Sequence, residues 1–167
     1  TIMGTLKQDV THDDHALYVC SKKILMTSVR NPAEAKWKEL GIDVVIESTG
    51  IFTARADLEK HLAAGAKRVL LTVPPKDNVD HMVVIGVNDD QLKPEHRLVS
   101  NASCTTNCLA PLAKVLDDSF GIKHGIMTTV HAYTNDQRLA DVPHEDFRRS
   151  RAAAENIIPT TTGAARA

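Results

Sequence analysis

Two residues of this 167-residue chain are the best placed for covalent catalysis, a cysteine at position 104 and a histidine at position 131. Cys104 follows a short apolar run and Ser103, which is suited to cap a helix, so its sulfur would face unpaired N–H groups at the positive end of a helix dipole. That environment lowers the pKa of a thiol and favours the nucleophilic thiolate. His131 ends an alternating run and could activate that thiol. Position alone leaves a buried structural cysteine and a structural histidine open as alternatives.

Hydroxyl-bearing residues gather around the cysteine and at a later glycine turn. They are Ser103, Thr105, Thr106, Thr134 and the three threonines 160–162, which Gly163 follows. Hydroxyls and backbone amides at helix starts and glycine turns suit an anion, phosphate above all. Each of them singly would also serve as a cap. Together, near one cysteine, they predict a phosphorylated substrate.

The remaining cysteines bear on compartment and metal binding. Three cysteines are an odd count and too few for a disulfide framework, so we expect a reducing compartment. Cys104 and Cys108 are four residues apart, a spacing that could present two metal ligands. No second Cys or His pair at zinc-finger spacing accompanies them, so we predict no metal site. Cys108 is expected to lie in the core.

The elements that must position these residues begin with β-type patterning. Apolar runs at 16–20 and 23–27 predict a hairpin. The segment 31–34 then has the order of an N-cap, a proline at the first helical position and a capping-box glutamate, and Gly41 supplies a stop. This order predicts a short helix that ends after Leu40.

Four short strands are expected next, at 42–47, 69–72, 82–85 and 98–100. A helix capped by Thr53 and closed by Gly65 lies between the first two, with Leu58, His61 and Leu62 on one face. Continuously apolar strands with helices between some of them predict a largely parallel sheet covered on both faces. Ligands of such sheets bind beyond the carboxyl ends of the strands, which here are compact and polar.

The second half of the chain predicts three further segments. The first is a helix over 103–120, with Leu109, Leu112, Val115 and Leu116 on an apolar face and Pro111 inside it. The second is a strand over 125–133, from its alternating pattern. The third is a long charged loop over 135–151, of a length that is usually functional or docked on a partner.

Composition and charge narrow the class of protein. Lys and Arg number 20 against 21 Asp and Glu, a net charge of −1, and the chain is 43% hydrophobic and 25% charged. These values are typical of a folded protein and exclude disorder. Near-neutral charge argues against a nucleic-acid partner, and no apolar run reaches the roughly 18 residues that span a membrane. We expect small molecules or protein as partners.

Both ends of the chain fall inside recognisable elements. Residue 1 is Thr, and the last residues follow a glycine turn at Gly163 that would enter a new helix. We therefore expect this chain to be a piece of a longer one.

Three runs together carry a resemblance to a known family. Residues 100–111, 131–138 and 156–165 resemble the signature of the phosphorylating glyceraldehyde-3-phosphate dehydrogenases, and shorter likenesses at 47–50, 65–67 and 86–88 extend it over essentially the whole chain. The resemblance implies an α/β fold. It implies the later part of a Rossmann-like dinucleotide-binding domain over 1–103 and the start of an α+β catalytic domain over 104–167.

The resemblance also implies roles for the reactive residues. Cys104 matches the thiol that adds to the aldehyde of D-glyceraldehyde 3-phosphate, and His131 matches the base that activates it. The resulting thioester is attacked by inorganic phosphate to give 1,3-bisphosphoglycerate. The site of that phosphate is matched by Ser103, Thr105, Thr162 and Gly163, and Thr134 matches a contact to the phosphate of the substrate.

The implied cofactor is NAD. Segments that line the dinucleotide are matched by Ser48, Thr49, Gly50 and Thr72, and Arg30 falls where the backbone of the family approaches the adenine. Pro143 is typical of members that prefer NAD. The loop from Tyr133 to about Ile157 matches a segment that packs against a neighbouring subunit of a homotetramer. A cytoplasmic location follows for such an enzyme.

Some expected features of a dinucleotide domain are absent from the sequence. It holds no Gly-x-Gly-x-x-Gly turn and no acidic ribose reader some twenty residues after one. The run 72–75 also departs from the common pattern of the family. Three alternatives stay open: an erythrose-4-phosphate dehydrogenase, a cysteine hydrolase or acyltransferase without a cofactor, and a non-catalytic binding module, which the absent glycine turn would favour.

Overall fold

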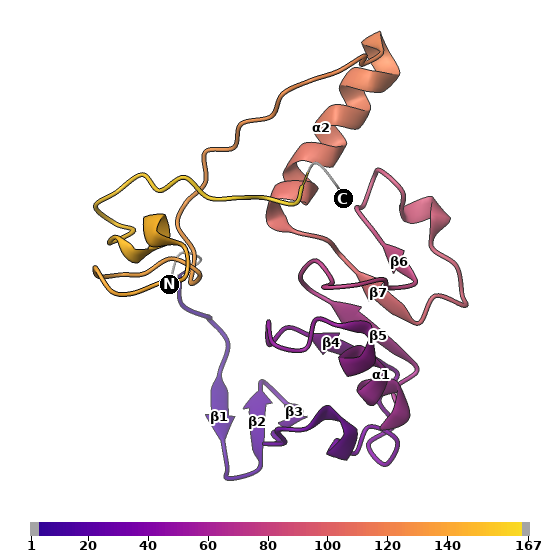
Figure 1. The fold of residues 1–167 in the computed structure, drawn as a ribbon. Helices are drawn as coiled ribbons and strands as arrows, with labels where there is room; N and C mark the ends of the chain where they lie inside the picture. The colour runs from indigo at the N-terminus through magenta and orange to yellow at the C-terminus, as the bar shows by residue number, and fades with distance from the viewer. Residues whose placement is uncertain (1–3, 165–167) are drawn as a thin grey trace.

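The computed structural model describes residues 4–164, and a four-stranded parallel sheet forms its core (Figure 1). The strand order is β4–β5–β7–β6, with β4 at Val44–Glu47, β5 at Arg68–Leu71, β6 at His81–Met82 and β7 at Leu98–Ser100. All three strand pairs are parallel, so the predicted parallel sheet and α/β class are confirmed. Two strands are shorter than predicted: β4 begins at Val44 rather than at residue 42, and β6 ends at Met82, after which the chain turns at Gly86, where φ is +79°.

Helix α1, Arg55–Ala63, packs on one face of this sheet and completes the core. Leu58 contacts Val69, Leu71 and Leu98, and all four side chains are at most 1% exposed. The predicted inward face of the helix is confirmed. Gly65 follows the C-terminal end of the helix, and its φ of +109° and close approach to Lys38 leave no room for a side chain.

The start of α1 differs from the prediction. Ala54 rather than Thr53 is the N-cap residue, and its side chain makes no capping hydrogen bond. Asp77 caps the helix from a distant loop instead, because its Oδ1 accepts the amide proton of Arg55 at 2.6 Å. Local sequence carries no signal of this long-range cap.

The opposite face of β4 is open. Val45 and Glu47 point toward α1 and are buried, whereas Val44 and Ile46 point away and are 50% and 62% exposed. The expectation of a sheet covered on both faces is therefore wrong for β4 within residues 4–164. The strand pattern specifies two apolar faces, but only one of them has a covering element in this part of the chain.

A separate antiparallel sheet forms the N-terminal part. It has the order β1–β2–β3, with β1 at Val10–His12, β2 at Ala16–Val19 and β3 at Lys22–Leu25. The predicted hairpin is confirmed as β2 and β3, which turn at Cys20 with a φ of +53°. Strand β1 was too short for the sequence pattern to reveal.

The prediction of a short helix after this hairpin is mostly wrong. Asn31 caps it as expected by accepting from the amide of Ala33 at 3.2 Å, but only the 3₁₀-helix η1, Pro32–Glu34, forms. The chain then extends and makes hydrogen-bonded turns up to Gly41. Tertiary hydrogen bonds from Trp37 to His61 and from Lys38 to Ala64 hold it there in place of further helix.

Helix α2, Cys104–Phe120, is the longest element and confirms the predicted helix (Figure 1). It ends at Gly121, where φ is +72°. Its apolar face is not covered within residues 4–164, since Leu112, Val115 and Leu116 are each at least half exposed. Cys108 is also exposed, so its predicted place in a core is wrong for the same reason.

Residues 121–164 are irregular apart from the 3₁₀-helix η3, Phe147–Ser150. The predicted strand over 125–133 is wrong: the segment has no strand partner among residues 4–164, and Ile126 and Val130 are almost fully exposed. The predicted charged loop is confirmed. A short 3₁₀-helix η2, Asp89–Gln91, lies earlier in the chain. The helix expected after Gly163 reaches into residues 165–167, outside the described range.

No helix in the described part of the chain is long and apolar enough to cross a membrane.

Candidate active site

Cys104 is the first residue of α2, and its thiol faces a histidine from the segment after that helix. Its Sγ lies 3.3 Å from Nε2 of His131, which is 27 residues away in the sequence. Ser103 caps the helix because its Oγ accepts the amide proton of Thr106 at 3.0 Å. The sulfur therefore lies at the N-terminus of a 17-residue helix, where the dipole favours negative charge.

A backbone carbonyl determines which nitrogen of His131 can react. Nδ1 lies 2.6 Å from the carbonyl oxygen of Ala132. A carbonyl oxygen only accepts, so Nδ1 carries a proton and donates it. Nε2 is then free to take the proton of the Cys104 thiol and to return it.

Charge at this pair favours the reactive form of the cysteine. The hydrogen bond with His131 lowers the pKa of the Cys104 thiol, against the opposing effect of partial burial, and the hydroxyl and amide of Thr105 lower it further. The hydrogen bond to the Ala132 carbonyl, together with the nearby thiol, raises the pKa of His131. Both directions favour a thiolate beside an imidazolium.

The backbone turn before Cys104 holds the residue in position. Ala102 is 1% exposed and has a φ of +61°, a conformation that non-glycine residues rarely adopt. Its amide donates to Oγ of Ser100 at 3.0 Å, and that hydroxyl donates to the carbonyl of Val73 at 2.8 Å. The turn is thereby tied to the carboxyl ends of β5 and β7.

Asn107 secures the same turn from the helix side. Its Nδ2 donates to the carbonyls of Asn101 and Ser103 at 2.7 and 2.9 Å. No role of Asn107 was predicted from the sequence. Its position one turn after the N-cap is the signal that could have indicated one, because side chains four residues apart share a helix face.

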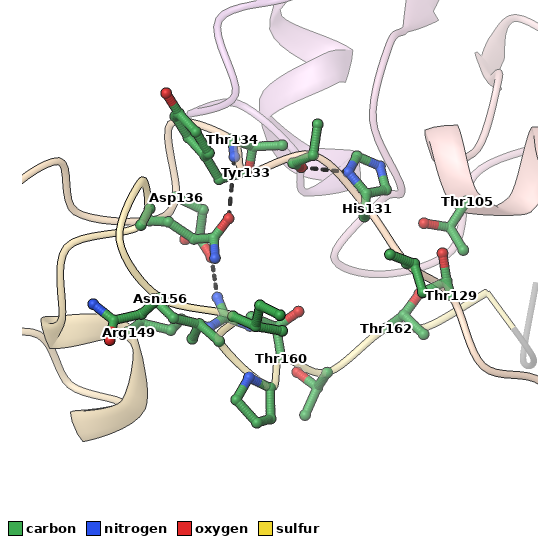
Figure 2. Close-up of a pocket in the computed structure, with 18 of the residues that line it drawn as sticks. Thr105, Thr129, His131, Tyr133, Thr134, Asp136, Arg149, Asn156, Thr160 and Thr162 are labelled. Carbon is green, nitrogen blue, oxygen red and sulfur yellow. Dashed lines mark hydrogen bonds and ion pairs between the residues drawn. The ribbon is translucent and has the colours of Figure 1, made fainter.

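A broad pocket of about 930 Å³ is lined by Cys104 and His131. Figure 2 shows His131 and other residues that line it. Three of the five residues predicted to hold phosphate line it, namely Thr105, Thr134 and Thr162. Ser103 does not line it and uses its hydroxyl in the cap of α2, and Gly163 does not line it either. The pocket thus brings the nucleophile, the base and three hydroxyl groups together from three separate segments.

One charged pair in this pocket was missed by sequence reasoning. Arg149 forms an ion pair with Asp136 across the long loop, and both residues line the pocket (Figure 2). Arg149 supplies a guanidinium to the lining of the pocket, and its side chain is 17% exposed. The two residues are 13 positions apart in an irregular segment, so no local pattern predicts that they meet.

Residues predicted to line the dinucleotide lie at the carboxyl edge of the sheet. Thr72 follows β5, and its amide and hydroxyl both donate to the carbonyl of Glu47 at the end of β4, at 3.0 and 3.2 Å. Ser48, Thr49 and Gly50 follow Glu47 and are exposed. Neutral hydroxyl and amide groups at adjacent parallel strand ends fit a dinucleotide that lies across them.

Arg30 is not brought to that edge by any hydrogen bond or ion pair within residues 4–164. It is exposed in the segment between β3 and η1. Over the same residues, no group of three or more His, Cys, Asp or Glu is arranged to hold a metal ion.

Two family models match the sequence. Residues 1–55 match the model described as "Glyceraldehyde 3-phosphate dehydrogenase, NAD binding domain", and residues 103–167 match "Glyceraldehyde 3-phosphate dehydrogenase, C-terminal domain". The predicted family and its NAD cofactor are confirmed at this level.

Proteins with sequences similar to this chain are named glyceraldehyde-3-phosphate dehydrogenase. A glyceraldehyde-3-phosphate dehydrogenase of Streptomyces coelicolor is 62% identical over the whole of this chain and 50% of its own length. That of Geobacillus stearothermophilus is 55% identical over the same shares, and that of Thermotoga maritima is 57% identical over 95% of this chain and 47% of its own length. The chain spans about half the length of these relatives. It belongs to the glyceraldehyde-3-phosphate dehydrogenase family.

Proposed function

We propose that the complete protein oxidises D-glyceraldehyde 3-phosphate to 1,3-bisphosphoglycerate with NAD and inorganic phosphate. The observation that carries this proposal is the 3.3 Å contact between Cys104 Sγ and His131 Nε2 at the start of α2, beside a pocket lined with hydroxyl groups. A thiolate at a helix N-terminus with an imidazole partner is what acyl transfer through cysteine requires.

In the oxidation step, Cys104 is the nucleophile. Its thiolate adds to the aldehyde carbon, and the resulting oxygen takes a proton from His131 to give a thiohemiacetal. Bound NAD supplies the chemistry of a hydride acceptor. His131 takes back the hydroxyl proton as the hydride leaves the carbon, and a thioester of Cys104 remains.

In the second step, inorganic phosphate releases the product. A phosphate oxygen attacks the thioester carbonyl carbon, the carbon–sulfur bond breaks, and the thiolate of Cys104 is restored. We assign this phosphate to Ser103, Thr105, Thr162 and Gly163, and the phosphate of the substrate to Thr134. Support comes from the three of these threonines that line the pocket, and from the suitability of hydroxyl and amide donors for anions.

We assign NAD to the strand ends at Ser48, Thr49, Gly50 and Thr72, with Arg30 toward the adenine. We further propose that the loop 133–157 packs against a second subunit in a homotetramer. A cytoplasmic location is proposed because all three cysteines are free and exposed, a state that suits a reducing compartment.

The test compares the complete protein with its Cys104→Ser variant. With aldehyde, phosphate and NAD, the wild type should form NADH and the variant should not. Iodoacetate should label Cys104 ahead of Cys20 and Cys108 near neutral pH; all three thiols are exposed, so access does not distinguish them. Equal labelling would reject Cys104 as the nucleophile. Thioester turnover without NADH formation would favour the acyltransferase, and preference for erythrose 4-phosphate the related dehydrogenase.

A further inference from the structure

Glu47, the last residue of β4, is a buried carboxylate bonded to the turn that follows it. Glu47 is 3% exposed. Oε1 accepts from both the amide and the hydroxyl of Thr49, at 2.8 and 2.5 Å. Within residues 4–164, no Lys or Arg forms an ion pair with it. Burial of a carboxylate is costly unless its oxygens accept hydrogen bonds. The hydrogen bonds to Glu47 therefore account for a glutamate at this buried position.

His61 bonds the other oxygen of that carboxylate from helix α1. It is 5% exposed, and its Nε2 lies 3.1 Å from Oε2 of Glu47. Its Nδ1 lies 3.1 Å from the indole Nε1 of Trp37. An indole N–H only donates, so Nδ1 accepts and the proton of His61 is on Nε2, directed at Glu47.

The hydrogen bonds therefore run in one direction, from Trp37 to His61 to Glu47, with Thr49 donating from the other side. The core of the sheet is formed by Leu58 and its apolar neighbours and needs no buried charge. The carboxylate of Glu47 instead accepts hydrogen bonds from Thr49, in an exposed turn. Thr49 is fixed further because its hydroxyl oxygen accepts the amide proton of Ile51 at 3.2 Å.

We infer that Glu47 and His61 are positioning residues that hold the turn Ser48–Thr49–Gly50 in the shape that binds the dinucleotide. This inference rests on the proposed function, since it takes that turn as part of the NAD site. Glu47 also holds Thr72 through its backbone carbonyl, so one residue fixes both neighbouring strand ends.

Because the hydrogen bonds run from Trp37 through His61 to Glu47, the isosteric variant Glu47→Gln tests whether they matter. A carboxamide offers one accepting oxygen where the carboxylate has two. With its oxygen toward Thr49, its N–H₂ group meets the Nε2–H of His61, donor against donor. His61 cannot move its proton to Nδ1, because the indole N–H of Trp37 already occupies that nitrogen.

The experiment measures the KM for NAD, kcat and the Cys104 alkylation rate in the complete protein. Loss of a charged hydrogen bond should raise the KM for NAD in Glu47→Gln by about tenfold. We expect kcat at saturating NAD, and alkylation without NAD, to stay within about twofold, because Cys104 lies in a different segment. Glu59→Gln is the matched control: the same change on α1, at an exposed carboxylate, should leave all three values unchanged.

A second variant separates positioning from general loss of structure. Trp37→Phe frees Nδ1 of His61, which can then carry the proton there and accept from the glutamine at Nε2. The double variant Glu47→Gln with Trp37→Phe should therefore recover part of the affinity for NAD. If Glu47→Gln does not fold, Trp37→Phe alone carries the test, with an expected rise of about two- to threefold in the KM for NAD.

The failures of the two proposals are distinguishable. A wild-type protein that forms no NADH overturns the proposed function. A wild-type protein that forms NADH, with an unchanged KM for NAD in folded Glu47→Gln, overturns only this inference. The same holds if the double variant binds NAD no better than Glu47→Gln, because a merely structural role predicts that two buried substitutions add their costs.

Discussion

Two histidines in two regions of the molecule differ in burial and in how many of their ring nitrogens are held by fixed partners. His61 lies in the sheet region, is 5% exposed, and has both ring nitrogens bonded, to Trp37 and to Glu47. His131 lies in the irregular region after α2 and is exposed, with Nδ1 bonded to a carbonyl and Nε2 facing a thiol.

The difference shows how environment assigns a role to a histidine. Around His61 every proton has a fixed partner in a well-packed core, so the ring can hold neighbouring groups in place but has no free site for chemistry. Around His131 one nitrogen is fixed and the other faces a group that can lose its proton. A fully partnered histidine positions, and a half-partnered one beside a nucleophile can transfer protons.

The largest effect that would sharpen this comparison is expected from His131→Asn. Loss of the base should lower kcat for aldehyde oxidation by about 10²–10⁴-fold in the complete protein. Because His131 lowers the pKa of Cys104, its removal raises that pKa, and the pH profile of Cys104 alkylation should move to higher pH. His124→Asn, an exposed histidine in the same segment, is the control. An unmoved profile would remove His131 from the role of base.

Stability should depend on the sheet region. Leu98, the first residue of β7, is fully buried in the cluster with Leu58, Val69 and Leu71. Leu98→Ala should lower the free energy of unfolding by about 2–5 kcal/mol through transfer and cavity costs. Leu92, 46% exposed, is the matched control, and Leu92→Ala should cost less than about 1 kcal/mol. Chemical denaturation gives both values. Equal losses would contradict the placement of the core.

Acid should weaken the sheet region through Asp80. Burial disfavours its charge, but the amides of Leu98 and Arg97 and the guanidinium of Arg55 outweigh burial and hold the pKa of this carboxyl below its usual value. A lowered pKa stabilises the fold above the unfolded value of about 4, and this stability is lost as pH falls through the folded pKa.

Asp80→Asn tests this contribution. The variant should lose about 1–2 kcal/mol at neutral pH and show a flatter loss of stability below about pH 4. Denaturant titrations at several pH values measure it, with the exposed Asp14→Asn as control. If the free energy of unfolding of the variant falls as steeply with acid as that of the wild type, other carboxylates account for the acid sensitivity.

The smallest effect is expected where the two regions join, at Ala102. Its positive φ strains an alanine by about 1–2 kcal/mol, and glycine would relieve that strain but add chain entropy of about 0.5–1 kcal/mol in the unfolded state. Ala102→Gly should therefore change stability by less than about 1 kcal/mol. Ala102→Val should cost more than about 2 kcal/mol, because a β-branched side chain would be buried at a positive φ. A well-tolerated valine would contradict the strained turn.

Much of the sheet region could be predicted from local sequence. The apolar runs that form β4, β5 and β7, the inward face of α1 and the cap of α2 at Ser103 are all properties of neighbouring residues. Predictions failed where a distant group intervened, as at Thr53, whose expected capping role is filled by Asp77. They also failed for 125–133, because a strand requires a partner that the alternating pattern cannot supply.

The candidate site divides in the same way. Sequence alone determined that Cys104 begins a helix and that hydroxyl groups lie near it, and the long signature runs determined the family. The tertiary structure alone decided that His131 reaches Cys104, that Arg149 meets Asp136 at the pocket, and that Trp37, His61 and Glu47 form one directed chain. The physical reason is range: caps and periodicity act over a few neighbouring residues, whereas these contacts join residues 13 to 27 positions apart, through backbone paths that only the packed fold selects.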